Sequence, residues 1–112
     1  MGYYAAFEGG LVFENSLSKE TQREITRLID EAMPLNQHDW PTDFSLYFSG
    51  SGNYGEDNVK EALIKISETA EIKEGDLEYS GEFDSYWRFI FQDSKWHEQN
   101  GNVVYAGPLY DL

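Results

Sequence analysis

Residues 76–91, DLEYSGEFDSYWRFIF, alternate polar and apolar side chains with a period of two before the segment runs into a dense aromatic cluster. Successive side chains of a β-strand point to opposite faces of its sheet. The pattern therefore predicts antiparallel strands with one buried face and one polar face.

The connection between these two strands decides which side chains share a face. With a three-residue loop at residues 84–86, Phe83 pairs with Trp87, and the apolar and aromatic side chains of both strands lie on one buried face. Glu82 then pairs with Arg88 on the other face, Glu78 pairs with Gln92, and Gly81 lies under Phe89. A two-residue loop would instead place carboxylates among the aromatic rings, which is costly in desolvation. We therefore predict the three-residue loop.

The remaining segments predict two helices and further strands. Residues 3–14 are typical of a hairpin that turns at Gly9-Gly10, and residues 44–49 of a half-buried strand after a loop over 34–43. Asn100-Gly101 indicates a turn within a four-stranded meander over 76–105. Ser18 is the expected N-cap of a helix that ends at Pro34. The two helices have apolar stripes at helical spacing, formed by Ile25, Leu28, Ile29 and Ala32 in the first and by Val59, Ala62, Leu63 and Ile66 in the second.

These elements predict an α+β fold in the order ββαβαββββ. Amphipathic helices bury their apolar stripes most simply against one face of an antiparallel sheet, so we expect a two-layer sandwich. A chain of 112 residues with 40% hydrophobic residues can bury one core, and residues 1–112 are predicted to form a single domain.

The charge balance restricts the partners of this chain. Twenty-one acidic and eight basic residues give a formal net charge of −13, which disfavours direct binding to nucleic acids and to anionic membranes and favours basic protein surfaces. The chain has no cysteine, no signal-peptide pattern and no apolar run long enough to span a bilayer. We therefore expect a cytoplasmic protein. The alternative role of the net charge is to keep the protein soluble, without a specific partner.

A row of acidic residues is the candidate partner-binding surface. Residues 71–84 contain six carboxylates and one lysine. Those at alternate positions of one strand are spaced by about 6.6 Å, roughly as phosphates are, and could imitate a nucleic-acid backbone. The alternative is an ordinary solvated sheet face. The candidate residues are Glu71, Glu74, Asp76, Glu78, Glu82 and Asp84.

The segment GSGNYG, residues 50–55, matches the G-x-G-x-x-G pattern of dinucleotide-binding loops. Glu56 and Asp57 would follow in the first helical turn, where they would repel a pyrophosphate, and the next strand is not a buried parallel strand. We interpret the segment as a turn that leads into a helix. A small-molecule-binding or enzymatic domain with a pocket near residues 50–55 remains the alternative function.

No other motif predicts catalysis, a cofactor or a metal. His38-Asp39 and His97-Glu98 lack metal-ligand spacing and are expected to be separate surface groups. Aromatic residues in loops or at element ends could serve as interface anchors. They are Tyr3, Tyr4, Trp40, Tyr54 and Tyr86.

Residues 75–107, GDLEYSGEFDSYWRFIFQDSKWHEQNGNVVYAG, resemble the C-terminal part of uncharacterised small acidic proteins of Gram-positive bacteria and their phages. Small acidic phage proteins include anti-CRISPR and anti-restriction inhibitors, so the resemblance favours a similar role, and it assigns no functional residue. We predict a non-enzymatic protein that binds a basic protein surface, such as that of a nucleic-acid-binding enzyme. An immunity protein against a basic toxin is a variant of this prediction.

Overall fold

A computed structural model describes residues 3–33, 35–54, 56–81, 86–101 and 109–112. Within these ranges the chain forms one antiparallel sheet of seven strands and two helices. The elements are β1 (Tyr3–Phe13), α1 (Lys19–Ala32), β2 (Gln37–Thr42), β3 (Ser45–Tyr54), α2 (Glu56–Thr69), β4 (Ile72–Gly81), β5 (Tyr86–Gln92), β6 (Lys95–Gly101) and β7 (Tyr110–Asp111).

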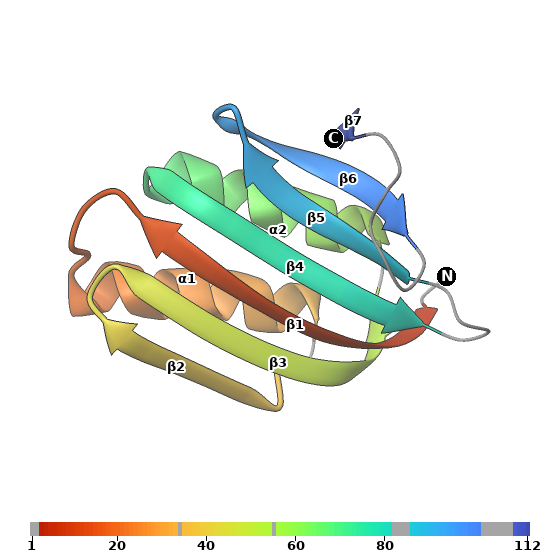
Figure 1. Ribbon diagram of the computed structural model, residues 1–112. Helices are drawn as coiled ribbons and strands as arrows, with labels where there is room; N and C mark the ends of the chain where they lie inside the picture. Colours follow the sequence, from red (N-terminus) through yellow and green to blue (C-terminus); the bar gives the residue numbers. More distant parts are fainter. Residues whose placement is uncertain (1–2, 34, 55, 82–85, 102–108) are drawn as a thin grey trace.

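The strands lie side by side in the order β2-β3-β1-β4-β5-β6-β7. Figure 1 shows α1 and α2 on the same side of this sheet. The predicted α+β class with an antiparallel sheet and two helices is confirmed. The predicted order ββαβαββββ is wrong near its start, because one strand precedes α1 and two strands separate the helices.

Both helices begin and pack as their sequences predict. The Ser18 side chain accepts a hydrogen bond from the Thr21 backbone N–H at 3.1 Å, which caps α1. Ile25 and Ile29 of α1 are fully buried, and Leu28 and Ala32 pack against the same core. All four residues of the predicted α2 stripe are buried. Helix α1 ends at Ala32, while the predicted stop, Pro34, lies outside the described residues.

Residues 3–13 form one long strand, so the predicted hairpin at Gly9-Gly10 is wrong. The two glycines provide space and do not form a turn. A Cβ at Gly9 would lie 2.6 Å from the Asp76 backbone oxygen and 2.9 Å from the Phe48 ring. A Cβ at Gly10 would lie 3.1 Å from the Tyr47 ring on the other face. The glycines therefore let β1 pair with β3 and β4 at once, in the middle of the sheet.

The segment after α1, predicted as a loop, contains β2. This strand pairs with β3 through Gln37–Asp39, and its register shifts between Asp39 and Thr42 around Pro41. Proline is compatible with this position because β2 is the outermost strand. In β3, Leu46 and Phe48 are buried as predicted, but Phe44 precedes the strand and is 44% exposed.

The glycine-rich segment continues β3 and does not turn into α2. Gly50 pairs with Phe7 and Gly52 with Ala5 of β1, so the predicted turn is wrong over residues 50–54. Gly52 has a φ of 151°, a backbone conformation that favours glycine. Gly55 lies outside the described residues. Gly50 and Gly52 are therefore strand residues.

The β4–β5 pairing keeps the predicted faces and changes the predicted register. Tyr79 pairs with Trp87 and Leu77 with Phe89, so each residue of β4 faces a partner four positions away from the predicted one. A shift by four, an even number, leaves the apolar side chains on the buried face. Tyr86 belongs to β5, so the predicted loop at residues 84–86 is wrong; Glu82, Phe83 and Asp84 lie outside the described residues.

The tight turn of the C-terminal part lies between β5 and β6. Asp93 and Ser94 have φ values of 55° and 65°, and Gln92 pairs with Lys95 across them, as in a primed two-residue turn. Asn100 and Gly101 are strand residues of β6, so the turn predicted there is wrong. The fourth predicted strand of the meander falls mainly on residues 102–108, outside the described residues.

Candidate protein-binding surface

The open face of the sheet, opposite the helices, carries a cluster of carboxylates. Phe7 and Leu11 of β1 point into the core, and Glu8 between them points to the open face. The register places Glu8 directly opposite Glu78 of β4 and places Gly10 opposite Asp76. Directly opposed side chains in antiparallel strands have Cβ atoms about 4.5–5.5 Å apart, so Glu8 and Glu78 are like charges at close range.

The carboxyl groups of β4 show the electrostatic consequence of this crowding. Burial raises the pKa of Asp76, and the neighbouring Glu8 raises it further, while Arg88 lowers it. Burial also raises the pKa of Glu78, with additional contributions from Asp76 and Glu8 and an opposing one from Arg88. The Oδ1 atom of Asp76 is buried and accepts no hydrogen bond from the described part of the chain. Negative charge on Asp76 and Glu78 is therefore less favourable than on an isolated carboxylate.

Arg88 of β5 only partly balances these acids. It pairs with Glu78 in the sheet register, and its Nε donates a hydrogen bond to Gln99 Oε1 at 2.8 Å. One guanidinium therefore interacts with the carboxylates of Asp76 and Glu78 and with the amide of Gln99, and the pKa values of both carboxyl groups remain raised.

A shallow hollow of about 670 Å³ extends the cluster toward the edge of the sheet. Its lining includes Glu8, Asp76 and Glu78 together with Asp39 of β2 and Tyr47 of β3. The Tyr47 side chain is 58% exposed and lies beside Gly10. We call Glu8, Asp39, Asp76 and Glu78 the acidic face. The acidic face thus combines four carboxylates from three strands with an exposed tyrosine.

The structure brings together two of the six predicted residues, Asp76 and Glu78. Glu74 is exposed further along β4, and Glu71 is exposed in the α2–β4 connection, where its backbone oxygen accepts a hydrogen bond from Glu14 N. Glu82 and Asp84 lie outside the described residues. Glu8 and Asp39 also belong to the cluster. The sequence did not predict them there, because their segments were predicted to form a hairpin and a loop and not strands of this sheet.

The two histidines are far apart in the sheet, as expected. His38 lies on the outermost strand β2, and His97 lies on β6, with β3, β1, β4 and β5 between them. His97 is not a surface group, however: it is 6% exposed, and its Nε2 donates to the Gln92 backbone oxygen at 2.9 Å. Its Nδ1 faces Asp111 Oδ1 at 3.1 Å. Lys95 Nζ donates a hydrogen bond to the Asp111 carboxylate at 2.8 Å and lowers the pKa of Asp111. The contacts of Asp111 with Lys95 and His97 therefore hold β7 against β6.

Of the predicted interface aromatics, Trp40 is not a free anchor. It is half-buried and stacks on Phe13, with ring centroids 6.0 Å apart and planes inclined by 19°. Tyr86 is half-buried beside the acidic face, in a smaller hollow shared with Glu8 and Glu78. For Tyr3, Tyr4 and Tyr54 the structure describes the strand positions and not the side chains.

The described residues contain no group of three or more His, Asp or Glu side chains arranged to hold a metal ion. Neither α1 nor α2, as far as they are described, has the length and apolar character needed to cross a bilayer. Comparison of the chain with protein families, with curated proteins and with solved structures gives no significant match. The functional argument therefore depends on the surfaces of this protein alone.

Proposed function

We propose that the protein is a non-enzymatic, cytoplasmic interaction protein whose acidic face binds a basic protein surface. The observation that carries the proposal is the gathering of Glu8, Asp39, Asp76 and Glu78 around exposed Tyr47. In the proposed two-layer arrangement, α1 and α2 cover the other face of the sheet and leave the acidic face free for a partner.

The electrostatics of the cluster support a cationic partner. Burial and neighbouring carboxylates raise the pKa values of Asp76 and Glu78, so the charged forms of these groups are electrostatically unfavourable. A Lys or Arg side chain of a partner would stabilise the charged forms. The net charge of −13 adds long-range attraction to any basic surface and repulsion from nucleic acids.

Two features favour a particular kind of partner. They are the spacing of the carboxylates and the resemblance of residues 75–107 to small acidic proteins of Gram-positive bacteria and their phages. Asp76 and Glu78 occupy alternate positions of β4, about 6.6 Å apart, which suits a groove built for phosphates. We propose that the protein occupies the nucleic-acid site of a basic enzyme such as a defence nuclease, as anti-CRISPR or anti-restriction proteins do. An immunity protein that covers a basic toxin would use the same surface.

The test is inhibition and binding across a panel of purified CRISPR effector nucleases, restriction enzymes and basic toxin nucleases. The double variant Glu8→Gln with Glu78→Gln removes two charges from the acidic face and keeps side-chain size. Against the enzyme that the wild-type protein inhibits, we expect association about three- to tenfold slower at low salt, with a weaker dependence on salt.

The matched control is Glu61→Gln with Glu68→Gln, which removes two exposed charges from α2 on the other side of the molecule. We expect it to change the association rate by less than about twofold, since distant charges are screened over about 10 Å. Equal slowing by both double variants would show that only total charge matters. Inhibition of no enzyme in the panel would contradict the proposed partner class.

A further inference from the structure

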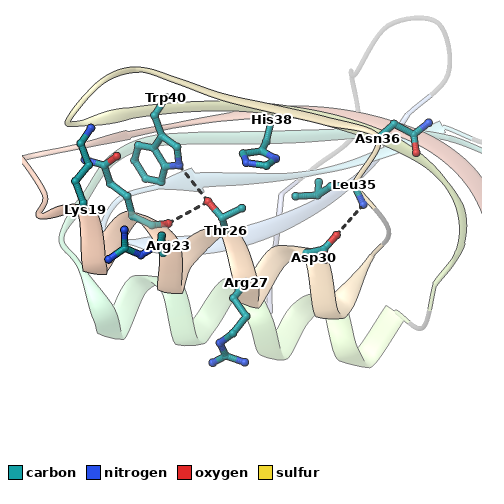
Figure 2. A pocket seen from close by; sticks show the side chains of 10 residues that line it. Lys19, Arg23, Thr26, Arg27, Asp30, Leu35, Asn36, His38 and Trp40 are labelled. Atoms are coloured by element: carbon teal, nitrogen blue, oxygen red, sulfur yellow. Dashed lines mark hydrogen bonds between the residues drawn. The ribbon is translucent and has the colours of Figure 1, made fainter.

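A second hollow, of about 580 Å³, lies between α1 and the outermost strand β2. Figure 2 shows Trp40 and His38 extending from β2 toward α1, and Thr26 reaching from α1 toward Trp40. One wall is a helical face, with lining residues from Lys19 to Asp30, and the other consists of alternate residues of the β2 segment. The hollow is therefore a groove along the edge of the sheet, which we call the edge groove.

The edge groove is held in shape by interactions within the protein. The Trp40 Nε1–H donates to Thr26 Oγ1 at 3.1 Å, and that hydroxyl donates to the Gln22 backbone oxygen at 3.0 Å. At the other end, the Leu35 N–H donates to Asp30 Oδ1 at 3.2 Å. A site whose walls are already fixed loses less conformational entropy when a ligand binds.

The edge groove has basic side chains although the protein is strongly acidic. Lys19 and Arg23 of α1 line it, together with one acidic residue, Asp30. Arg23 makes no hydrogen bond or ion pair within the described ranges, where the other basic residues except Lys73 all have partners. Lys19 contacts Asp43 only at 3.4 Å, in an exposed pair. Arg27 also lines the groove, but its guanidinium is held by Glu24 and Glu31.

The strand beside the groove has a free edge. β2 ends the sheet, so its outer side has no strand partner among the described residues. Pro41 and the shifted register interrupt regular strand pairing in the second half of β2. The regular part of the strand is Gln37, His38 and Asp39. A groove between a helix and the free edge of a sheet is the geometry in which extended peptides add as a further strand.

We propose that the edge groove binds an extended acidic segment of a partner protein as an additional strand beside β2. The groove spans α1 from residue 19 to residue 30, about 16 Å at about 1.5 Å per residue, and about five extended residues cover this length. Alternate side chains of the segment enter the groove. An Asp or Glu pairs with Arg23 and Lys19 at the Trp40 end, and an uncharged side chain lies at the other end, where Asp30 repels acids. This site is separate from the acidic face, which takes a basic partner.

The probe is the capped heptapeptide acetyl-Thr-Asp-Thr-Thr-Thr-Val-Thr-amide, together with its reversed sequence, titrated into the ¹⁵N-labelled protein and followed by NMR. We expect one of the two to bind with a Kd below about 1 mM, with shifts at the amides of Gln37 and Asp39 and at the Arg23 side chain. The same peptide with Asn in place of Asp should bind at least about tenfold more weakly, because it loses a charge-assisted contact.

Two variants with equal charge change test the role of Arg23. Arg23→Gln should raise the Kd at least about tenfold, whereas Lys73→Gln, at the other basic residue without a described partner, should change it less than about twofold. Equal weakening by both variants would show a general charge effect and overturn the site.

Further measurements distinguish strand addition from other kinds of binding in the groove. Inorganic phosphate that shifts Arg23 as strongly as the peptide does, without moving the β2 amides, would identify a simple anion site and overturn strand addition. Failure of both peptides to saturate below about 1 mM, or shifts that grow with protein concentration in the absence of peptide, would also overturn the proposal.

Discussion

Asp76 is the residue at which the competing effects on the acidic face are clearest. Its side chain is half-buried, its Oδ1 accepts no hydrogen bond from the described residues, and Glu8 lies nearby on the adjacent strand. Arg88 offsets only part of this cost, because it also bonds Gln99 and faces Glu78. A carboxylate kept in such surroundings stabilises the fold less than a neutral side chain of equal size would.

We therefore predict that Asp76→Asn raises the melting temperature at pH 7 by about 2–5 °C. The folded-state pKa of Asp76 is raised above its unfolded value, so the folded state binds the proton more tightly. The stability that Asp76 contributes is then fully present below the unfolded pKa and lost as the pH rises through the folded pKa. The advantage of Asn should accordingly vanish toward pH 3.

Thermal unfolding at several pH values between 3 and 8 measures this effect. Glu68→Gln, an exposed change on α2, is the control and should shift the melting temperature by less than about 1 °C at any of these pH values. A lower melting temperature for Asp76→Asn at pH 7 would mean that attraction to Arg88 outweighs burial.

At the scale of elements, β1 organises the sheet because it pairs along nearly its whole length with both β3 and β4. The close approach of β4 and of the Phe48 ring at Gly9 shows why glycine is needed at this position of the strand. The same long strand places Glu8 beside Glu78 and thereby creates the acidic face.

Gly9→Ala should lower the free energy of unfolding by about 1–3 kcal/mol, since its Cβ would lie 2.6 Å from a backbone oxygen that cannot move alone. Gly10→Ala should cost less than about 1 kcal/mol, because its contact is the ring of exposed Tyr47, which can swing away. Urea denaturation of both variants measures the difference. Equal costs would contradict the distinction between backbone and side-chain contacts.

At the scale of the whole molecule, charge is unevenly distributed. The acidic face occupies the open side of the sheet, and Arg23, which has no ion-pair partner among the described residues, lies in the edge groove between α1 and β2. Several of the bases neutralise acids locally, as Lys65 does with Glu61 and Lys95 with Asp111. Mutual repulsion among the excess carboxylates therefore dominates the electrostatics of the folded chain.

Added salt should stabilise the protein for this reason. The screening length falls from about 30 Å at 0.01 M to about 10 Å at 0.1 M ionic strength, which weakens long-range repulsion more than contact ion pairs. We expect the melting temperature at pH 7 to rise by several degrees between about 10 mM and 500 mM NaCl. A falling melting temperature over this range would show that surface ion pairs contribute more than the net charge costs.

Local patterns were sufficient to predict the helices and the faces of the strands. Ser18 and the apolar stripe with Ile25 and Ile29 define α1 because capping and periodicity act within a few residues. The alternation in β4 and β5 assigns Tyr79 and Phe89 to the core, since period two fixes the face whatever the partner. His38 and His97 were expected to be separate groups, and four strands lie between them in the sheet.

Contacts between distant segments decided the rest. Gly9-Gly10 and the glycines of residues 50–54 have the composition of turns but lie in strands. At Gly9 and Gly10 a neighbouring strand and large rings need the space of a missing Cβ, and Gly52 has a φ of 151°. The β4–β5 register depends on the length of a connection that local propensity does not determine. Glu8, Asp39 and the β4 pair Asp76 and Glu78 come from three separate parts of the sequence, so they line one hollow only once β2, β3, β1 and β4 are side by side.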